Sequence, residues 1–454
     1  MVKATLAAIG FLGAFAAVSL QVPQYFSVEY DVRQPAPVAE EAIAAEEEVV
    51  QELPPIEDTR PVVSHVPLPP QVKTIYMTSC VAGTPSFRQD LVELMLETEI
   101  NSVIIDIKDY SGTISYPSKL EAWKPAWQNA RCGTADMREL VQMLHDNNIF
   151  VIARITVFQD PFYTQSHPEL AVKKADGVTV WKDNKGLSFI DVAAKPYWDH
   201  IVALSAEVYN LGFDELNFDY VRYPSDGPMN DISFPHSMAG EHGADKQANL
   251  EAFFKYLSEQ LSDEALFAEY RHENTGRESA VPWTSADLFG MTTTNTDDLS
   301  IGQVIERAAP YFNFIAPMVY PSHYPNSFLG LGNPNDHPYK VVNYAMASGV
   351  ERMESPTTVV EGFLHEPETY TNASGTVMQT GKYKKPVYSP SKLRTWIQDF
   401  DYGGDYDAAD VRAQIQASYD AGVMDWMIWA PSNRYTKAAL LPPNTYEVGQ
   451  DVQP

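Results

Sequence analysis

The 454-residue sequence contains little cysteine and too few basic residues to balance its acidic ones. Its two cysteines exclude a scaffold held by several disulfides and a zinc ribbon built from four cysteines. Lysine and arginine together number 32 against 60 aspartates and glutamates, which gives a net charge of −28. An acidic surface repels the phosphate backbone, so the composition argues against a nucleic-acid partner.

Several motifs of cofactor-dependent and nucleophilic chemistry are also missing. The sequence contains no Gly-x-Gly-x-x-Gly loop, no Gly-x-Ser-x-Gly elbow and no His-Glu-x-x-His pair. Its ten histidines are scattered along the chain and form no obvious metal-ligand set. We therefore expect no metal site and no cofactor.

The first 71 residues differ in composition from the rest. Lys3 precedes an uncharged apolar stretch over residues 4–20, so residues 1–20 are predicted to be a signal anchor or a signal peptide. Residues 21–71 hold 10 acidic residues, 2 arginines and 9 prolines, which predicts a disordered acidic linker because such a segment cannot build a core. Either interpretation of residues 1–20 places the remainder outside the cytoplasm, membrane-anchored or secreted, with membrane contact through this segment only.

Eight short runs rich in Val, Ile and aromatic residues follow, and segments of helical period separate them. The runs begin at Thr74, Ser102, Val151, Glu215, Ser285, Phe314, Thr395 and Asp425. Helical spacing is clearest over residues 197–211, 250–261 and 411–419. Strands and helices that alternate in this number predict an α/β fold, a (β/α)₈ TIM barrel over residues 72–440, followed by a tail at 441–454.

Long connections are expected to lie on one face of this barrel. Residues 110–135 and 224–245 directly follow strands, so they belong to the carboxyl-terminal face, where barrel enzymes keep their sites. A third connection, residues 321–392, is expected to contain one helix and an inserted hairpin or loop. Cys80 and Cys132 both lie in segments of that face, and export would favour a disulfide between them.

Polar residues alternate with apolar ones along several predicted strands. Glu215, Asn217 and Asp219 share one face of their strand, and the residues between them are apolar. Alternation therefore points the polar set at the barrel axis, where burial is costly unless the groups are paired or serve chemistry. The same reasoning directs further side chains inward or to strand ends: Asp106, Lys108, Arg154, Asp287, Tyr320, Gln398 and Trp429.

A ring of carboxyl groups suits glycoside hydrolysis, which needs a proton donor for the leaving oxygen and a base or nucleophile across the sugar ring. Asp219 ends its strand and is predicted to be the essential carboxylate, with Arg222 nearby to keep it ionised. Substrate binding is predicted for Asp106, Lys108, Arg154, Asn217, Arg222, Tyr320, Gln398 and Trp429. The alternative is a purely structural ion-pair cluster of Asp106, Lys108, Arg154 and Glu215.

Six motifs also occur in the order of a known family. They are DIKD from Asp106, FDYVRYP from Phe218, SADLFG from Ser285, PMVYPSHY from Pro317, WIQDF from Trp396 and MIWAPSNRY from Met427. These motifs resemble the bacterial "putative glycosyl hydrolase domain" family, a TIM barrel distantly similar to the α-amylase-like hydrolases. The resemblance spans roughly residues 72–440 and implies hydrolysis of O-glycosyl bonds.

The α-amylase-like pattern implies catalytic acids at the ends of the fourth and fifth strands. Asp219 and Asp287 stand at those places, so the resemblance makes Asp287 the acid partner of Asp219. Two features depart from the pattern: α-amylases carry Glu as the fifth-strand acid, and their arginine precedes the Asp by two residues. Asp109, Glu361 and Asp399 therefore stay alternatives for the acid.

Together these features predict an extracytoplasmic glycoside hydrolase that acts on a polysaccharide or oligosaccharide by a two-carboxylate acid/base mechanism. The alternative is a non-catalytic carbohydrate-binding or cell-surface scaffold barrel, which would share an aromatic cleft but lack two opposed carboxyl groups. A metal-dependent deacylase is a third class, and no ligand set for it is found.

Overall fold

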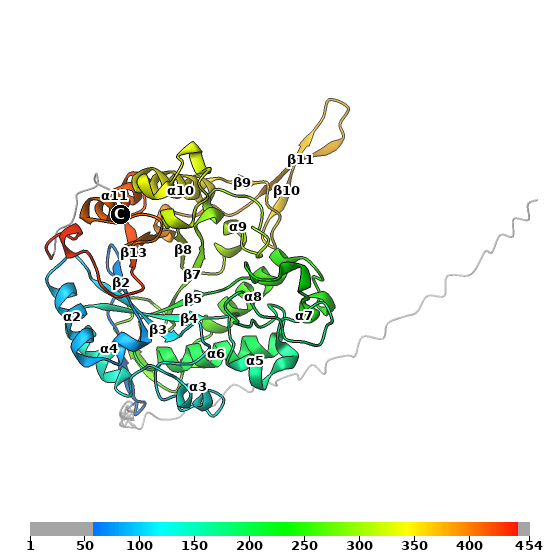
Figure 1. The fold of residues 1–454 in the computed structure, drawn as a ribbon. Coiled ribbons are helices and arrows are strands. Elements are labelled where there is room, and N and C mark those ends of the chain that lie inside the picture. Colours follow the sequence, from blue (N-terminus) through cyan, green and yellow to red (C-terminus); the bar gives the residue numbers. More distant parts are fainter. Residues whose placement is uncertain (1–57, 444–454) are drawn as a thin grey trace, which may run out of the picture. The chain divides into compact units, whose positions relative to one another are not determined.

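The computed structural model describes residues 58–443, which contain a closed barrel of eight parallel strands (Figure 1). In neighbour order the strands are β2 (Lys73–Met77), β3 (Ser102–Lys108), β4 (Phe150–Thr156), β5 (Glu215–Asp219), β7 (Trp283–Phe289), β8 (Phe314–Met318), β12 (Arg394–Gln398) and β13 (Asp425–Trp429). The last strand pairs with the first and closes the cylinder. Each predicted run coincides with one strand, and the predicted TIM barrel is confirmed.

Helices surround the strands and bury the outward-facing side chains (Figure 1). The long ones are α2 (Pro85–Leu96), α4 (Met137–His145), α6 (Lys195–Tyr209), α8 (Lys246–Leu261), α10 (Pro338–Glu354) and α11 (Ala408–Asp420). The short ones are α1 (Ser79–Ala82), α3 (Lys124–Gln128), α5 (Tyr163–Ser166), α7 (Pro235–Ala239) and α9 (Ile305–Ala308). Each fully buried Leu, Ile or Phe between strands and helices stabilises the fold by about 1.5–3 kcal/mol.

Two connections shape the surroundings of the barrel. The predicted insertion contains a hairpin of β10 (Glu366–Thr371) and β11 (Val377–Lys384), which also pairs with β9 (Thr357–Thr358) and projects from the barrel (Figure 1). The connection after β4 was not predicted to be long, yet it extends to α6. With residues 224–245 it forms a small second core around Val172, Trp181 and Phe189.

The predicted linker extends too far toward the barrel. β1 (Val62–Ser64) pairs in parallel with β6 (Arg271–Glu273). His65 is 4% exposed, and the backbone N–H of Val66 donates to Asp214 Oδ1 at 2.9 Å. The compact unit therefore begins at Thr59 and not at residue 72. This short strand was not predicted because the composition of residues 21–71 was considered as a whole, and prolines and acidic residues dominate that segment.

The other predictions for the chain ends lie outside the described residues. These are the signal anchor or signal peptide at 1–20, the linker up to residue 57 and the tail from residue 444. Within residues 58–443, no helix has both the length and the apolar character needed to cross a membrane.

A disulfide joins Cys80 in α1 to Cys132 in the connection after β3, as predicted. The two Cα atoms lie 4.6 Å apart, and the bond spans 52 residues of sequence. It ties the segments that follow β2 and β3. A cross-link over such a loop restricts the unfolded chain and typically stabilises a protein by about 2–4 kcal/mol.

The pairing of β1 predicts how far the chain can be shortened. A chain that begins at Asp58 should melt at the temperature of the full chain, because it keeps β1 and the contacts of Asp214. A chain that begins at Gln71 should melt several degrees lower, because buried Asp214 loses the N–H of Val66 and its contact with His65. Calorimetric melting measures both, and equal melting temperatures would show that β1 adds no stability.

Candidate active site

Arg154 on β4 lies inside the barrel, 6% exposed, and faces carboxyl groups from three other strands. Its Nη1 donates to Asp106 Oδ1 of β3 at 2.6 Å. Its Nε donates to Asp219 Oδ2 of β5 at 3.1 Å, and its Nη2 donates to the same oxygen. Asp287 Oδ2 of β7 lies 3.8 Å from Nε. One positive charge thus faces three carboxyl groups. Because three negative charges would repel one another, this cluster favours protonation of one of its carboxyl groups.

Asp219 is held from two sides at the end of β5. Its Oδ2 accepts from Arg154, and its Oδ1 accepts from the backbone N–H of Tyr220 at 2.5 Å. Tyr220 has a φ of 52°, which is unfavourable for a residue with a bulky side chain. Strain of this kind costs about 1–3 kcal/mol and clusters at functional sites.

Asp287 provides the proton-carrying carboxyl group of the cluster. Its Oδ1 accepts from Asn217 Nδ2 at 2.9 Å and from Trp396 Nε1 at 2.8 Å. Burial first, and then the neighbouring Asp219 carboxylate, raise the pKa of Asp287 to about 8. At neutral pH this carboxyl group is therefore mostly protonated.

The distances to Arg154 limit the separation of the two carboxyl groups. Asp219 Oδ2 lies 3.1 Å and Asp287 Oδ2 lies 3.8 Å from the same Nε atom, so these oxygens cannot be farther apart than the two distances combined. Retaining glycosidases separate their carboxyl groups by about 5–5.5 Å and inverting ones by about 6.5–9.5 Å. The geometry accommodates the retaining distance and only the lower end of the inverting range.

Two aromatic side chains, Tyr76 and Trp429, lie beside Asp106 and Arg154. Tyr76 donates its hydroxyl hydrogen to Asp106 Oδ2, and its ring stacks on Trp429 with the centroids 4.1 Å apart. The guanidinium carbon of Arg154 lies 5.1 Å from the centroid of Trp429, close enough for a cation–π contact. Burial raises the pKa of Asp106, although Arg154 opposes this. Tyr76 was not among the predicted site residues, although alternation along β2 turns it inward as it does Asp106 along β3.

Tyr320 follows β8 and lies next to the carboxyl groups. Its side chain is buried, yet its hydroxyl makes no hydrogen bond to any residue in the range 58–443. Burial, followed by the charges of Asp287 and Asp219, raises the pKa of Tyr320 well above its usual value. The hydroxyl therefore keeps its proton and can donate a hydrogen bond to a bound molecule.

Lys108 does not point at the barrel axis, contrary to the prediction. A register shift between Asp106 and Lys108 places an extra residue in β3, so that Lys108 pairs with outward-facing Ile155. Its Nζ lies 3.0 Å from Asp160 Oδ2 and donates to the carbonyl of Thr156 at 2.7 Å. Lys108 thus belongs to a separate buried network.

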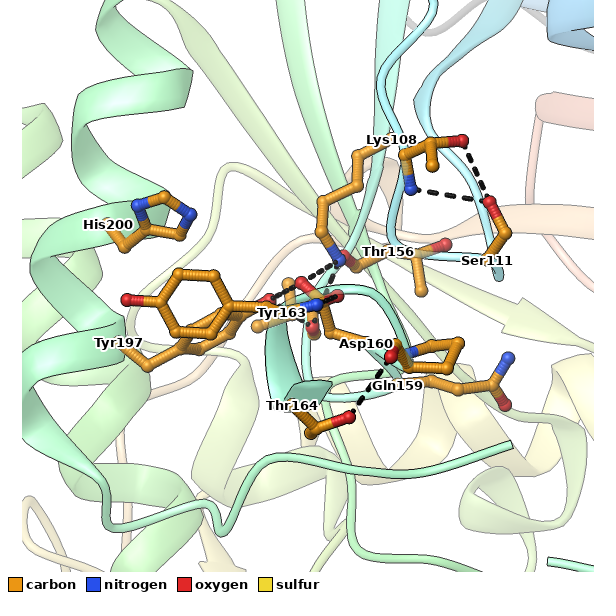
Figure 2. A network of polar contacts seen from close by, with 12 residues as sticks. Lys108, Ser111, Thr156, Gln159, Asp160, Tyr163, Thr164, Tyr197 and His200 are labelled. Atoms are coloured by element: carbon orange, nitrogen blue, oxygen red, sulfur yellow. Dashed lines mark hydrogen bonds and ion pairs between the residues drawn. The ribbon is translucent and has the colours of Figure 1, made fainter. Parts of the chain in front are cut away.

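Figure 2 shows this network around Lys108 and Asp160. Tyr197 donates its hydroxyl hydrogen to Asp160 Oδ2 at 2.7 Å, while Tyr163 N donates to Asp160 Oδ1 at 2.7 Å. The rings of Tyr163 and His200 lie beside the ion pair. Lys108 therefore joins the end of β3 to the connection after β4 and cannot contact the carboxyl groups around Arg154.

Burial lowers the pKa of Arg222, and Asp219 lies near enough for its charge to oppose that shift, although the two side chains do not pair directly. Its Nη1 donates to the carbonyl of Tyr223 at 3.0 Å, and its guanidinium lies over the rings of Tyr220 and Phe289. Within residues 58–443 it forms no ion pair with Asp219. Arg154 fills that position from the neighbouring strand.

Gln398 is also engaged within the protein. Its Oε1 accepts from the N–H and hydroxyl of Ser322, at 3.2 and 2.7 Å, and its Nε2 donates to the carbonyl of Phe400 at 2.9 Å. The side chain joins the connection after β8 to the end of β12. Contact of Arg222 or Gln398 with a substrate stays a prediction.

The four residues of the structural alternative do not form one cluster: Asp106 pairs with Arg154, Lys108 with Asp160 and Glu215 with Arg394. At the opposite end of β5 from Asp219, Glu215 accepts from Arg394 Nη1 with both oxygens, at 2.7 and 2.6 Å, and also accepts from Ser285. Glu215 and Arg394 have side chains that are fully buried. This pair is buried at the base of the barrel and is not exposed to solvent.

The alternative acids lie apart from Arg154. Asp109 Oδ1 accepts from the N–H and hydroxyl of Ser111. Asp399 accepts from the N–H and hydroxyl of Thr436, one with each oxygen. Glu361 is exposed and lies 3.4 Å from the hydroxyl of Tyr383. Among the described residues, no three His, Cys, Asp or Glu side chains are arranged to hold a metal ion.

Comparison with solved structures finds several similar chains. A hypothetical protein from Ruminiclostridium thermocellum is 30% identical over 44% of this chain and 98% of its own, with a TM-score of 0.36. The PgaB (BpsB) glycoside hydrolase domain from Bordetella bronchiseptica is 12% identical over 82% of this chain and 94% of its own, with a TM-score of 0.49. An α-galactosidase from Thermus thermophilus is 11% identical over 82% of this chain and 64% of its own, with a TM-score of 0.42.

The family comparison covers most of the barrel. None of the curated proteins matches the chain. A family model described as "Putative glycosyl hydrolase domain" matches residues 74–374 and 366–435. These ranges contain all the strand ends that carry Asp106, Arg154, Asp219 and Asp287. The chain therefore belongs to the "Putative glycosyl hydrolase domain" family.

Proposed function

We propose that this protein hydrolyses glycosidic bonds of a polysaccharide with Asp219 and Asp287 as its two carboxyl groups. The observation that carries the proposal is their shared contact with Arg154 at the mouth of the barrel, together with the raised pKa of Asp287. One group is thereby poised to hold a proton while the other accepts only hydrogen bonds. Glycoside hydrolysis requires this division between acid and base or nucleophile.

The proposed reaction assigns one step to each group. Asp287 gives its proton to the leaving glycosidic oxygen as the bond to the sugar breaks. Asp219 attacks the anomeric carbon, and water then releases the sugar; in an inverting reaction Asp219 would instead activate the water. Tyr320 and Trp429 are proposed to hold the sugar, the first through its free hydroxyl and the second through its partly exposed ring.

We also propose that the reaction takes place outside the cytoplasm. The disulfide between Cys80 and Cys132 supports an oxidising compartment, in which such bonds persist. The apolar stretch at residues 4–20, which lies outside the described part of the chain, supports export or a membrane anchor.

One observation favours the alternative, a barrel that binds carbohydrate without cleaving it. The side chain of Asp287 is 1% exposed, and its Oδ1 is occupied by Asn217 and Trp396. A proton donor must reach the leaving oxygen, so this burial demands that Oδ2 faces the substrate. Incubation of the protein with a panel of bacterial and plant glycans distinguishes the hydrolase from the binding barrel. Newly formed reducing ends are measured, and only a hydrolase releases them.

Replacement of Asp219 by Asn should abolish turnover. Asn keeps the shape but cannot act as nucleophile or base, so kcat should fall by about a thousandfold or more. Initial rates on a glycan cleaved by the wild-type protein measure this. Because the change also breaks a buried ion pair, folding must be checked by its melting temperature.

Glu215→Gln is the matched control on the same strand. It too breaks a buried ion pair, the one with Arg394, and such a loss typically costs about 3–5 kcal/mol. The folded variant should keep wild-type kcat, because Glu215 lies at the other end of β5. Equal losses of kcat in both variants would mean that Asp219 acts only through stability.

The pKa of Asp287 predicts the alkaline limit of activity. Its folded-state pKa is raised, so the proton is bound at neutral pH and is lost as the pH rises through about 8. The kcat/KM of the wild-type protein should fall above that pH, since the proton donor is then ionised. In Asp287→Asn the residual activity should lack this alkaline limb, whereas an unchanged limb would exclude Asp287 as the acid.

A further inference from the structure

A hollow lies on the surface near the candidate active site. The segments that follow β12 and β13 line an open cavity of about 590 Å³, within the size range of small-molecule sites. Its lining includes the aromatic residues Phe400, Tyr402 and Tyr406 and the charged residues Asp401 and Arg434. None of these residues contacts Arg154 or the three carboxyl groups around it.

Asp401, Tyr402 and Arg434 are exposed in the lining of the cavity, and the guanidinium of Arg434 lies 5.7 Å from the ring centroid of Phe87. The side chain of Tyr402 is 65% exposed, so most of its ring is accessible to a bound molecule. Arg434 and Asp401 form no ion pair within residues 58–443, although Asp401 Oδ1 accepts from the N–H of Tyr406 at 2.9 Å. The cavity thus offers an aromatic face, a donor and an acceptor.

The cavity adjoins the carboxyl groups through two side chains. The ring of Phe400 lies 6.1 Å from the ring of Tyr320, and Tyr320 is near enough to Asp219 and Asp287 for their charges to raise its pKa. On the other side, Tyr402 lies 6.4 Å from His323, measured between ring centroids. A molecule that occupies this cavity and also reaches the carboxyl groups around Arg154 must therefore extend past Tyr320.

We propose that this cavity is an outer subsite that binds a neutral pyranose residue of the same glycan chain. This inference rests on the proposed function and names a further part of its substrate site. Tyr402 stacks on the apolar face of the sugar, while Asp401 and Arg434 bind its hydroxyl groups. The two charges are opposite and Asp399 is held by Thr436, so the cavity does not require a charged sugar.

Calorimetric titration of the full chain carrying Asp219→Asn tests this, because that change prevents cleavage during the measurement. Maltohexaose, cellohexaose, chitohexaose and mannohexaose serve as neutral probes, with the matching disaccharides for comparison. Adding Tyr402→Ala should weaken binding of the best hexasaccharide by about tenfold. Disaccharide binding should not change, because a disaccharide fits beside Trp429 alone. If Asp219→Asn does not fold, sulfur-linked hexasaccharides replace the probes with the wild-type protein.

Tyr370→Ala is the matched control, since Tyr370 is 52% exposed but lies on β10 outside the cavity. It should leave all affinities unchanged. Equal affinity of the parent and Tyr402→Ala for hexasaccharides overturns the proposal, as does the absence of any hexasaccharide binding. Stronger, Tyr402-dependent binding of a chitosan hexamer or an oligogalacturonate would overturn the neutral class.

The outcome separates this proposal from the proposed function. If the wild-type protein cleaves glycans and Tyr402→Ala changes no affinity, the subsite is wrong and hydrolysis stands. If hexasaccharides bind through Tyr402 but no glycan is ever cleaved, the subsite stands and hydrolysis is wrong.

Discussion

The buried guanidinium of Arg154 is the constraint on which the mouth of the barrel depends. A charge removed from water is tolerated only when other groups pair with it, and here Asp106, Asp219 and Asp287 surround it. Three ionised carboxyl groups would carry more negative charge than one guanidinium can balance, so this cluster of side chains favours protonation of one carboxyl group. Burial and the neighbouring Asp219 place that proton on Asp287. The division between a protonated and an acceptor carboxyl thus follows from one side chain.

Both ends of the barrel hold a buried pair of an arginine and a carboxylate, but the surroundings of the two pairs differ. At the base, Arg394 and Glu215 are fully buried and joined by two hydrogen bonds, while Arg394 Nη2 has no hydrogen-bond partner within residues 58–443. At the mouth, Arg154 and Asp219 keep a small exposed fraction, and strained Tyr220 follows directly. The two ends therefore differ in backbone strain and in exposure, and strain of this kind clusters at functional sites.

Much of the fold could be predicted because a barrel strand repeats every two residues. Alternation turned Asp106, Arg154, Asn217 and Asp219 inward, and the structure gathers all of them. The same rule failed for Lys108, because one extra residue in β3 reverses the direction of every later side chain. The sequence of β3 contains no residue pattern that predicts such a bulge.

Contacts between distant segments were harder to predict. Arg222 stands close to Asp219 in sequence, yet the partner is Arg154 from the adjacent strand, since the register of β4 against β5 decides which side chains meet. The pairing of β1 with β6 was hidden for a similar reason, because it joins segments about 200 residues apart. The disulfide was predictable since both cysteines follow neighbouring strands.

The most direct test of this account measures the protonation of the aspartates themselves. Carbon-13 NMR of the protein labelled at aspartate carboxyl carbons follows each group as the pH changes. The account predicts one carboxyl that titrates near pH 8 and whose signal is absent in Asp287→Asn. If every aspartate is already ionised at pH 6, no protonated acid exists in the site. The proposed division of roles between Asp219 and Asp287 would then be wrong.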